Sequence, residues 1–352
     1  MALQRFPGLI DVHAHLREPG ATQKEDFYTG SRAAVKGGFT FIIDMPNNPI
    51  PTFSPKALEE KIRLSKEKAI CDIGFHYGTN GKNIDTFPLV WNNPVVFGLK
   101  LYCNHTTGDY LIEDPVLLEK VFIDWKSNKP ILVHAEGEKL ALTLSLAKKY
   151  DHHLHVCHIT QGSEVEMVRK AKKQRQSVSA GVCPHHLFLT NRDVTRLGPF
   201  AIMKPPLPIR ADQDALWEGI ADRTIDLVET DHAPHTKEEK SKTPPSSGVP
   251  GLETAVGLLF KAVHEGRINS NDVLRLLYTA PKELFSVPEQ QDTYVELDPE
   301  EEWTVATPYE SKCGWSPFEG WELYGSIATV VIGGVPVLQG GKTIKKESYG
   351  KS

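Results

Sequence analysis

Two histidines one residue apart follow the first apolar run of the chain, in the segment GLIDVHAHLREPG at residues 8–20. In a β-strand, residues i and i+2 point to the same face, so His13 and His15 can present their imidazoles together at the end of a strand. Imidazole nitrogens are common zinc ligands. A single His-x-His pair is nevertheless more often structural, so its meaning depends on what the rest of the chain supplies.

Three more candidate ligands stand at the ends of later apolar segments. His134 ends ILVH, His158 ends HVCH, and Asp231 follows LVET. Four imidazoles and one carboxylate form a nitrogen and oxygen donor set that suits zinc or a similar divalent ion. A purely structural explanation would require the same coincidence four times, so the pattern favours a metal centre.

Lys100 lies within the apolar segment VVFGLKLY. A buried, unpaired ammonium is costly, and neighbouring cations increase the cost. The lysine could pair with a carboxylate or reach solvent from the strand end. Alternatively, the neutral amine could react with CO2 to give N6-carboxylysine, an anionic carbamate that can bridge two metal ions. The residue alone leaves these readings open, and the ligands around it favour the carbamate.

A binuclear centre would explain why so many ligands recur. Two divalent ions about 3.5–4 Å apart can share a hydroxide, lower its pKa and polarise a carbonyl. Asp231 is then a candidate for both a metal ligand and the group that carries a proton during catalysis.

Three polar residues are candidates for substrate binding. The guanidinium of Arg17 could bind a substrate carboxylate, or it could pair with Glu18 or Asp26. Asn47, in MPNNP, is either a turn residue or a contact to a substrate amide. His235, in TDHAPH, is close enough to the predicted site to contact a ligand. We expect two adjacent pairs, at 152–153 and 185–186, to be solvated or to lie beside the site.

Short apolar segments alternate with amphipathic ones along the chain, which predicts an α/β fold, most simply a (β/α)8 TIM barrel. Strands are expected at 9–13, 40–44, 69–76, 95–102, 130–134, 155–158, 177–183 and 224–231. Helices are expected at 54–68, 115–127, 138–150, 162–175 and 251–264. In such a barrel the carboxyl ends of the strands share one rim, where the candidate ligands would meet.

The barrel is predicted to span residues 8–287. After residue 288, alternating residues and paired glycines indicate short antiparallel strands, so residues 1–7 and 288–352 are expected to form a small β appendage and a C-terminal tail. Long polar loops at 103–114 and 235–251 follow predicted strands, where barrel enzymes carry their active-site loops.

Composition narrows the class of partner. The 352 residues carry a formal net charge of −5, which gives no reason to expect nucleic acid or an anionic membrane. No apolar run approaches the roughly 20 residues that span a bilayer. Five scattered cysteines without a C-x-x-C motif fit a reducing cytoplasm. A small-molecule substrate is therefore expected.

In combination, several segments resemble the dihydroorotases of the amidohydrolase superfamily, and most closely the dihydroorotase domains of the multifunctional proteins of eukaryotic pyrimidine synthesis. These segments are DVHAHLREPG, GLKLY, VHAE, HVCHIT, CPHHLFLT, KPPL, TDHAPH and PGLET. The resemblance runs from about residue 6 to 340. It implies reversible cyclisation of N-carbamoyl-L-aspartate to L-dihydroorotate at two zinc ions with a carboxylated lysine.

The resemblance also implies individual roles. Ligands of the first metal match His13, His15, Lys100 and Asp231. Ligands of the second metal match Lys100, His134 and His158. Asp231 resembles the general acid and base, and the substrate-binding residues match Arg17, Asn47 and His235.

The loop at 103–114 resembles a flexible loop that covers the substrate, with Thr106 and Thr107 as substrate contacts at its tip. Thr107 departs from the bulky aromatic residue of the animal domains. Gly181 replaces a glutamate that the animal domains use for an extra zinc, which weighs against a third ion at Cys157. The short segment before the first strand suggests part of a larger multifunctional polypeptide, and a homodimer is expected.

Two other functions fit parts of the pattern. One is an allantoinase or a dihydropyrimidinase of the same superfamily, since DMPNNP is similar to the allantoinase pattern. Arg17 argues against it, because dihydroorotate carries a carboxylate whereas allantoin and uracil do not. The other is a catalytically inactive dihydroorotase-like scaffold, which the six intact ligand positions disfavour.

Overall fold

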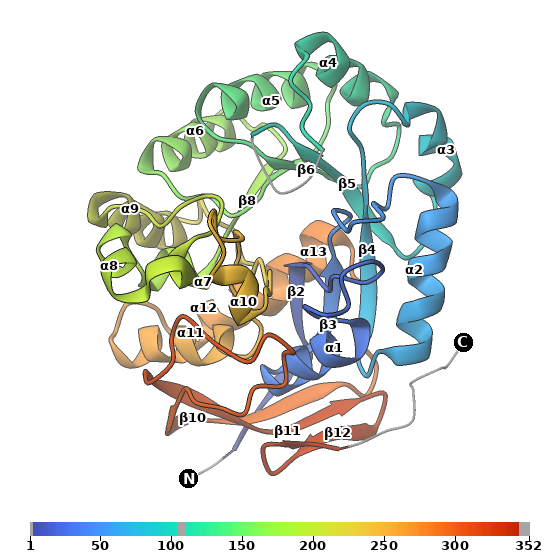
Figure 1. Cartoon of the computed structure of the whole chain (residues 1–352). Helices are drawn as coiled ribbons and strands as arrows, with labels where there is room; N and C mark the ends of the chain where they lie inside the picture. Colours follow the sequence, from blue (N-terminus) through green and yellow to red (C-terminus); the bar gives the residue numbers. More distant parts are fainter. Residues whose placement is uncertain (1–2, 105–109, 345–352) are drawn as a thin grey trace.

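Eight parallel strands, in the order β2 to β9, form a sheet that curves into a barrel surrounded by helices (Figure 1). The computed structural model describes residues 3–104 and 110–344. The barrel strands are β2 (Leu9–Ala14), β3 (Phe39–Asp44), β4 (Asp72–Gly78), β5 (Val96–Tyr102), β6 (Ile131–His134), β7 (Leu154–Val156), β8 (Val178–Val182) and β9 (Leu227–Val228). The predicted (β/α)8 barrel is confirmed.

The helices lie where amphipathic segments begin with capping residues. Ser54 and Asp114 cap α2 and α4 by accepting backbone N–H bonds, and a proline follows each cap. The α-helices are α1 (Phe27–Lys36), α2 (Pro55–Lys68), α3 (Phe87–Val90), α4 (Pro115–Asp124), α5 (Gly137–Lys149), α6 (Gly162–Lys173), α7 (Pro184–Phe188), α8 (Val194–Leu197), α9 (Arg210–Ala221), α10 (Lys237–Lys240), α11 (Ala255–His264), α12 (Ser270–Leu274) and α13 (Ala280–Phe285). None of the helices in the described part of the chain is long and apolar enough to cross a bilayer.

Two strands end two or more residues before their predicted ends, and the reason lies in the residues that follow them. The strands expected at 155–158 and 224–231 are reduced to β7 and β9. His158 and Asp231 have φ values of 37° and 44°, in the left-handed region that residues other than glycine rarely adopt. The backbone therefore turns out of the sheet at both candidate ligands.

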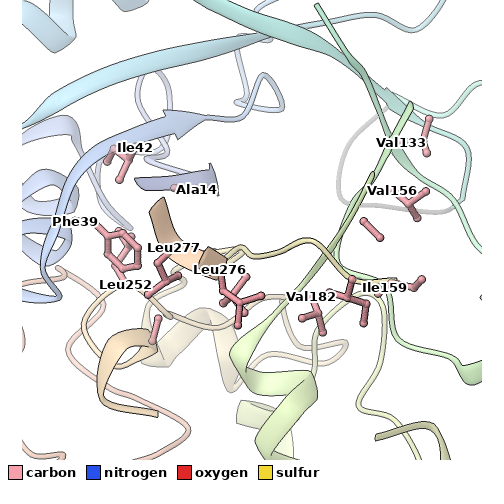
Figure 2. Close-up of a cluster of buried hydrophobic side chains, with 14 of the residues drawn as sticks. Ala14, Phe39, Ile42, Val133, Val156, Ile159, Val182, Leu252, Leu276 and Leu277 are labelled. Carbon is pink, nitrogen blue, oxygen red and sulfur yellow. The ribbon is translucent and has the colours of Figure 1, made fainter. Parts of the chain in front are cut away.

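Apolar side chains pack on both sides of the barrel wall. Ile42 of β3 and Val133 of β6 belong to the large cluster between the strands and the helices (Figure 2). Phe41 and Ile43, the neighbours of Ile42, belong instead to a second cluster that reaches Phe285. This alternation with a period of two is expected of a strand buried on both faces.

The seam between the first and last strands is closed by side chains and a single β-bridge. Ala14 pairs with His232, and His15 N donates to His232 O at 2.8 Å. Asp11, fully buried, accepts bonds from the backbone N–H and the hydroxyl of Thr230 at 3.0 and 2.5 Å. Burial raises the pKa of Asp11 to about 7, although the bonds from Thr230 oppose the shift. Asp11 thus joins the two ends of the barrel sheet.

The chain ends form a separate antiparallel sheet, as expected. Its strands are β1 (Gln4–Pro7), β10 (Tyr294–Thr304), β11 (Glu322–Ile332), β12 (Val335–Gln339) and β13 (Lys342–Thr343), in that order. The boundaries predicted for the barrel, 8–287, fall between β1 and β2 and between α13 and β10. Helix α11 contacts β11 and connects this sheet to the barrel.

Replacing Asp11 with alanine is expected to lower the free energy of unfolding by about 2–4 kcal/mol, because two donors of Thr230 lose their buried acceptor. Urea denaturation of the metal-depleted chain measures the effect, with the exposed Asp85→Ala as the control. Equal stability of the two variants would show that the seam does not depend on this carboxylate.

Candidate metal centre at the barrel mouth

All six predicted metal ligands line one cavity at the carboxyl ends of the strands. His13 belongs to β2, Lys100 to β5 and His134 to β6, while the other three ligands lie one to three residues after the ends of β2, β7 and β9. The cavity encloses about 450 Å³ including its open mouth. Its lining consists of His13, His15, Arg17, Asn47, Lys100, Tyr102, His134, His158, Lys204, Asp231, Ala233, Ser247 and Gly248. All six candidate ligands are buried.

The carboxylate of Asp231 faces two imidazoles. Its Oδ1 lies 2.9 Å from His15 Nε2 and 3.4 Å from His13 Nε2. Ligand atoms of the three residues lie within 4.8 Å of one another, so one ion could bind all three. Burial would raise the pKa of Asp231, but the imidazoles of His15, His13 and His185 beside its carboxylate outweigh burial and hold that pKa below its usual value.

Asn47 determines which nitrogen of His15 is free. Its Oδ1 lies 2.7 Å from His15 Nδ1. An amide oxygen only accepts, so Nδ1 carries the hydrogen and the lone pair of Nε2 faces Asp231. Burial lowers the pKa of His15 to about 4, so a second proton is not available at neutral pH. A cation between Nε2 and the carboxylate would satisfy both, as zinc does in carboxylate–histidine sites.

A second pair of imidazoles lies beside this group. His134 Nδ1 is 3.0 Å from His158 Nε2, and the ring of His158 is 5.2 Å from that of His13. Within the described residues, His134 Nε2 and His158 Nδ1 are buried without a hydrogen-bond partner. Burial lowers the pKa of both rings, to about 3 for His134. Both rings are therefore neutral, the form that binds metals.

Lys100 does not match either conventional explanation. It is fully buried, so it does not reach solvent. In the part of the chain that is described, no carboxylate forms an ion pair with its ammonium, and its Nζ donates instead to Cys157 Sγ at 3.1 Å. A buried lysine amine without a counterion, beside imidazoles, suits conversion to an anionic carbamate.

Glu229 was not predicted, although it lies two residues before Asp231 near the same strand end. It is fully buried, and its Oε2 lies 3.3 Å from both His13 Nδ1 and His155 Nε2. A Cβ atom at Gly181 would come within 2.6 Å of the Glu229 Cδ. Glycine at 181 therefore makes room for Glu229, so Cys157 and His13 have a carboxylate nearby despite the missing glutamate.

Arg17 lines the cavity with its side chain half-buried and its φ at 62°. Its Nε donates to Pro234 O at 3.1 Å. Neither alternative ion pair forms, because Glu18 pairs with Lys68 and Asp26 pairs with Lys312.

His235 lies behind Arg17 and is absent from the cavity lining of the described residues. Its Nε2 donates to Ser247 O at 2.9 Å, and Lys24 Nζ lies 3.2 Å from Nδ1. Burial, followed by the charges of Arg17 and Lys24, lowers its pKa to about 2. His235 is therefore neutral, and its Nε2 lies 3.2 Å from Arg17 Nη2.

Lys204 is a second cation in the lining that sequence reasoning left without a role, although its motif KPPL was noted. The fully buried Lys240 holds this region together. Its Nζ donates to the carbonyls of Ile202, Ser246 and Gly248 at 2.8, 2.9 and 3.1 Å. Thr106 and Thr107 lie outside the described residues.

Comparison with known proteins identifies relatives over nearly the whole chain. A sequence model described as "Amidohydrolase family" matches residues 6–286. Multifunctional protein pyr1-3 of Dictyostelium discoideum is 41% identical over 349 residues, which are 98% of this chain and 16% of that protein. Dihydroorotase of Lactobacillus acidophilus is 34% identical over 376 residues, covering 95% of this chain and 88% of that protein. The chain thus spans about a sixth of the multifunctional relative.

Two solved structures have the same fold. L-hydantoinase (dihydropyrimidinase) from Arthrobacter aurescens superposes with a TM-score of 0.93 at 22% identity, covering 99% of this chain and 88% of that one. The inactive dihydroorotase-like domain of a Chaetomium thermophilum CAD-like multifunctional protein gives a TM-score of 0.85 at 25% identity, covering 99% and 98%.

Replacing Asn47 with alanine is expected to weaken the binding of a divalent ion such as Zn²⁺ by about 10- to 100-fold, because the ring of His15 loses the hydrogen-bond acceptor that fixes its orientation. Competition with a chromophoric chelator measures the affinity of the metal-depleted chain. The exposed Asn92→Ala is the control, and wild-type affinity in Asn47→Ala would contradict the assigned contact.

Proposed function

This chain belongs to the amidohydrolase family, and within that family we propose that it is a dihydroorotase. It would interconvert N-carbamoyl-L-aspartate and L-dihydroorotate in pyrimidine biosynthesis. The observation that carries the proposal is one cavity in which six candidate metal ligands lie beside Arg17. Relatives named dihydroorotase support it, whereas the similarity to the hydantoinase structure extends to the fold alone.

We assign two zinc ions and a carbamate on Lys100 to this cavity. His13, His15 and Asp231 would hold the first ion, His134 and His158 would hold the second, and the carbamate would join them. When bound, such ions polarise a carbonyl and lower the pKa of a water molecule. The neutral imidazoles and the unpaired lysine support this assignment.

Asp231 would move the proton in both directions of the reaction. In ring opening, its carboxylate takes a proton from the attacking water and passes it to the ring amide nitrogen as the C–N bond breaks. In ring closure, it takes the proton of the ureido nitrogen while that nitrogen attacks the side-chain carboxylate, and the displaced oxygen leaves as water after receiving this proton and one more from solution. Its lowered pKa keeps it ionised and able to accept. Closure consumes one proton overall, so lower pH favours dihydroorotate.

Arg17 and Lys204 would bind the carboxylate that remains on the substrate. Both line the cavity, and a guanidinium can form paired hydrogen bonds to a carboxylate. Hydantoin and allantoin lack this group. A catalytically inactive scaffold, like the Chaetomium thermophilum domain, is the less favoured alternative, because all six ligand residues are present here.

We further propose that the chain is the dihydroorotase part of a larger multifunctional polypeptide in the cytoplasm. Its 41% identity to a multifunctional protein supports the first point. All five cysteines are free and buried, which fits a reducing compartment. The homodimer is proposed from the family resemblance.

Asp231→Asn and Lys100→Ala are expected to reduce turnover of both substrates by about 1,000-fold or more, because the proton carrier or the proposed bridging ligand is lost. The assay follows carbamoyl-aspartate, dihydroorotate, hydantoin and allantoin, with bound zinc quantified. Exposed Asp85→Asn and Lys82→Ala are the controls. Faster turnover of hydantoin or allantoin would contradict a dihydroorotase, and zinc-loaded wild type without turnover would indicate a scaffold.

Arg17→Met is expected to raise KM for dihydroorotate by about 10- to 100-fold with a smaller change in kcat, since one charge-assisted contact to the carboxylate is lost. Steady-state kinetics separate the two constants, and the exposed Arg63→Met is the matched control. An unchanged KM would remove Arg17 from the substrate contacts.

A further inference from the structure

The segment CPHH, residues 183–186, places a thiol and two imidazoles where β8 passes into α7. We expected His185 and His186 to be solvated or beside the site, but both are buried, with exposed fractions of 2% and 0%. Cys183 is also fully buried. None of the three residues belongs to the proposed zinc centre or to the lining of its cavity.

The three side chains converge on one point. Ligand atoms of Cys183, His185 and His186 all lie within 4.8 Å of one another, and the two rings are 4.2 Å apart. Within the described residues, His185 Nε2 and His186 Nδ1 are buried without a hydrogen-bond partner. Such groups require an explanation, because buried polar atoms are almost always paired.

The other nitrogen of His186 is already held by the backbone. Its Nε2 lies 3.2 Å from Pro205 O. A carbonyl only accepts, so Nε2 carries the hydrogen and Nδ1 keeps a free lone pair. Metal-binding histidines typically have this arrangement, with one nitrogen on the metal and the other donating to a carbonyl.

We propose that Cys183, His185 and His186 form a separate site for one zinc-type divalent ion. Thiolate and imidazole are the donors that zinc prefers in proteins. Zinc–sulfur and zinc–nitrogen bonds of about 2.3 and 2.0–2.1 Å place tetrahedral donors about 3.3–3.7 Å apart. Each pair of donor atoms, at most 4.8 Å apart, must therefore move closer by about 1.5 Å or less, a shift that rotation of the side chains can produce. On binding, the ion replaces the thiol proton, which leaves to water, and a sulfur–metal bond forms.

A reactive thiol is the main rival explanation. Burial, with the nearby carboxylates of Asp231 and Glu229, raises the pKa of the Cys183 thiol well above its usual value. Without a cation the group is therefore a protonated thiol and a poor nucleophile. The same carboxylates favour a positive ion nearby.

The site would also connect to the substrate cavity. Pro205, whose carbonyl holds His186, directly follows Lys204 of the cavity lining. An ion on His186 would thus anchor the segment that positions Lys204. The inference does not depend on the proposed function, because the two centres share no ligand.

Cobalt(II) absorption distinguishes this site from the proposed zinc centre, since only a thiolate ligand gives sulfur-to-cobalt charge transfer in the near ultraviolet. The full chain is depleted with a chelator and titrated with Co²⁺. We expect the final intensity of this band to correspond to one thiolate-bound cobalt per chain, and we expect the band to remain in Cys157→Ser and to disappear in Cys183→Ser. Cys157 is the matched control, because it is a second buried thiol near Lys100 and Glu229.

The proposal is overturned if the wild type lacks the band, or if Cys157→Ser abolishes it while Cys183→Ser keeps it. His186→Asn retains the thiol and is the second test variant, to be used if Cys183→Ser does not fold. It should weaken the cobalt affinity measured from the band by at least about tenfold, and unchanged affinity would equally overturn the site.

Discussion

The closure of the barrel between its first and last strands is the constraint on which the site depends. Strand β9 has only two residues, so regular pairing with β2 does not hold this seam. The buried carboxylate of Asp11 does so through Thr230, together with the bridge between Ala14 and His232. Because Asp231 lies between Thr230 and His232, these contacts also fix its carboxylate opposite the imidazoles of His13 and His15. The contacts that close the barrel therefore also hold Asp231 in place as a candidate ligand.

Neighbouring side chains hold the ligands before any ion arrives. Asn47 fixes the ring of His15, and Glu229 lies against the ring of His13. Both contacts leave imidazole nitrogens directed at the cavity. Since burial keeps the rings of His15 and His134 neutral, an entering cation would compete with few protons there and require little rearrangement. Such preorganisation suits a site that binds its metals tightly.

The sequence predicted the barrel well, because strand alternation is local and the shared rim follows from the fold. The predicted strands at β7 and β9 extend too far, since His158 and Asp231 have left-handed backbones that strand propensity does not predict. The contacts between Asn47 and His15, and the space that Gly181 leaves for Glu229, join segments that are distant along the chain. Residue types and spacing carry no signal for such pairings, which appear only when the strands are packed.

Substrate selection must come from the loops, because hydantoinases share this barrel. Among the described residues that line the cavity away from the metal ligands, the cationic side chains are Arg17 and Lys204. His235 adds no charge, because burial and its cationic neighbours keep it neutral. Its Nε2 donates to Ser247 O and lies 3.2 Å from Arg17 Nη2, so Arg17 forms no ion pair with His235 as it would with a carboxylate. The guanidinium therefore keeps its charge for an acidic ligand, and under the proposed function the loop after β2 would select an acidic over a neutral substrate.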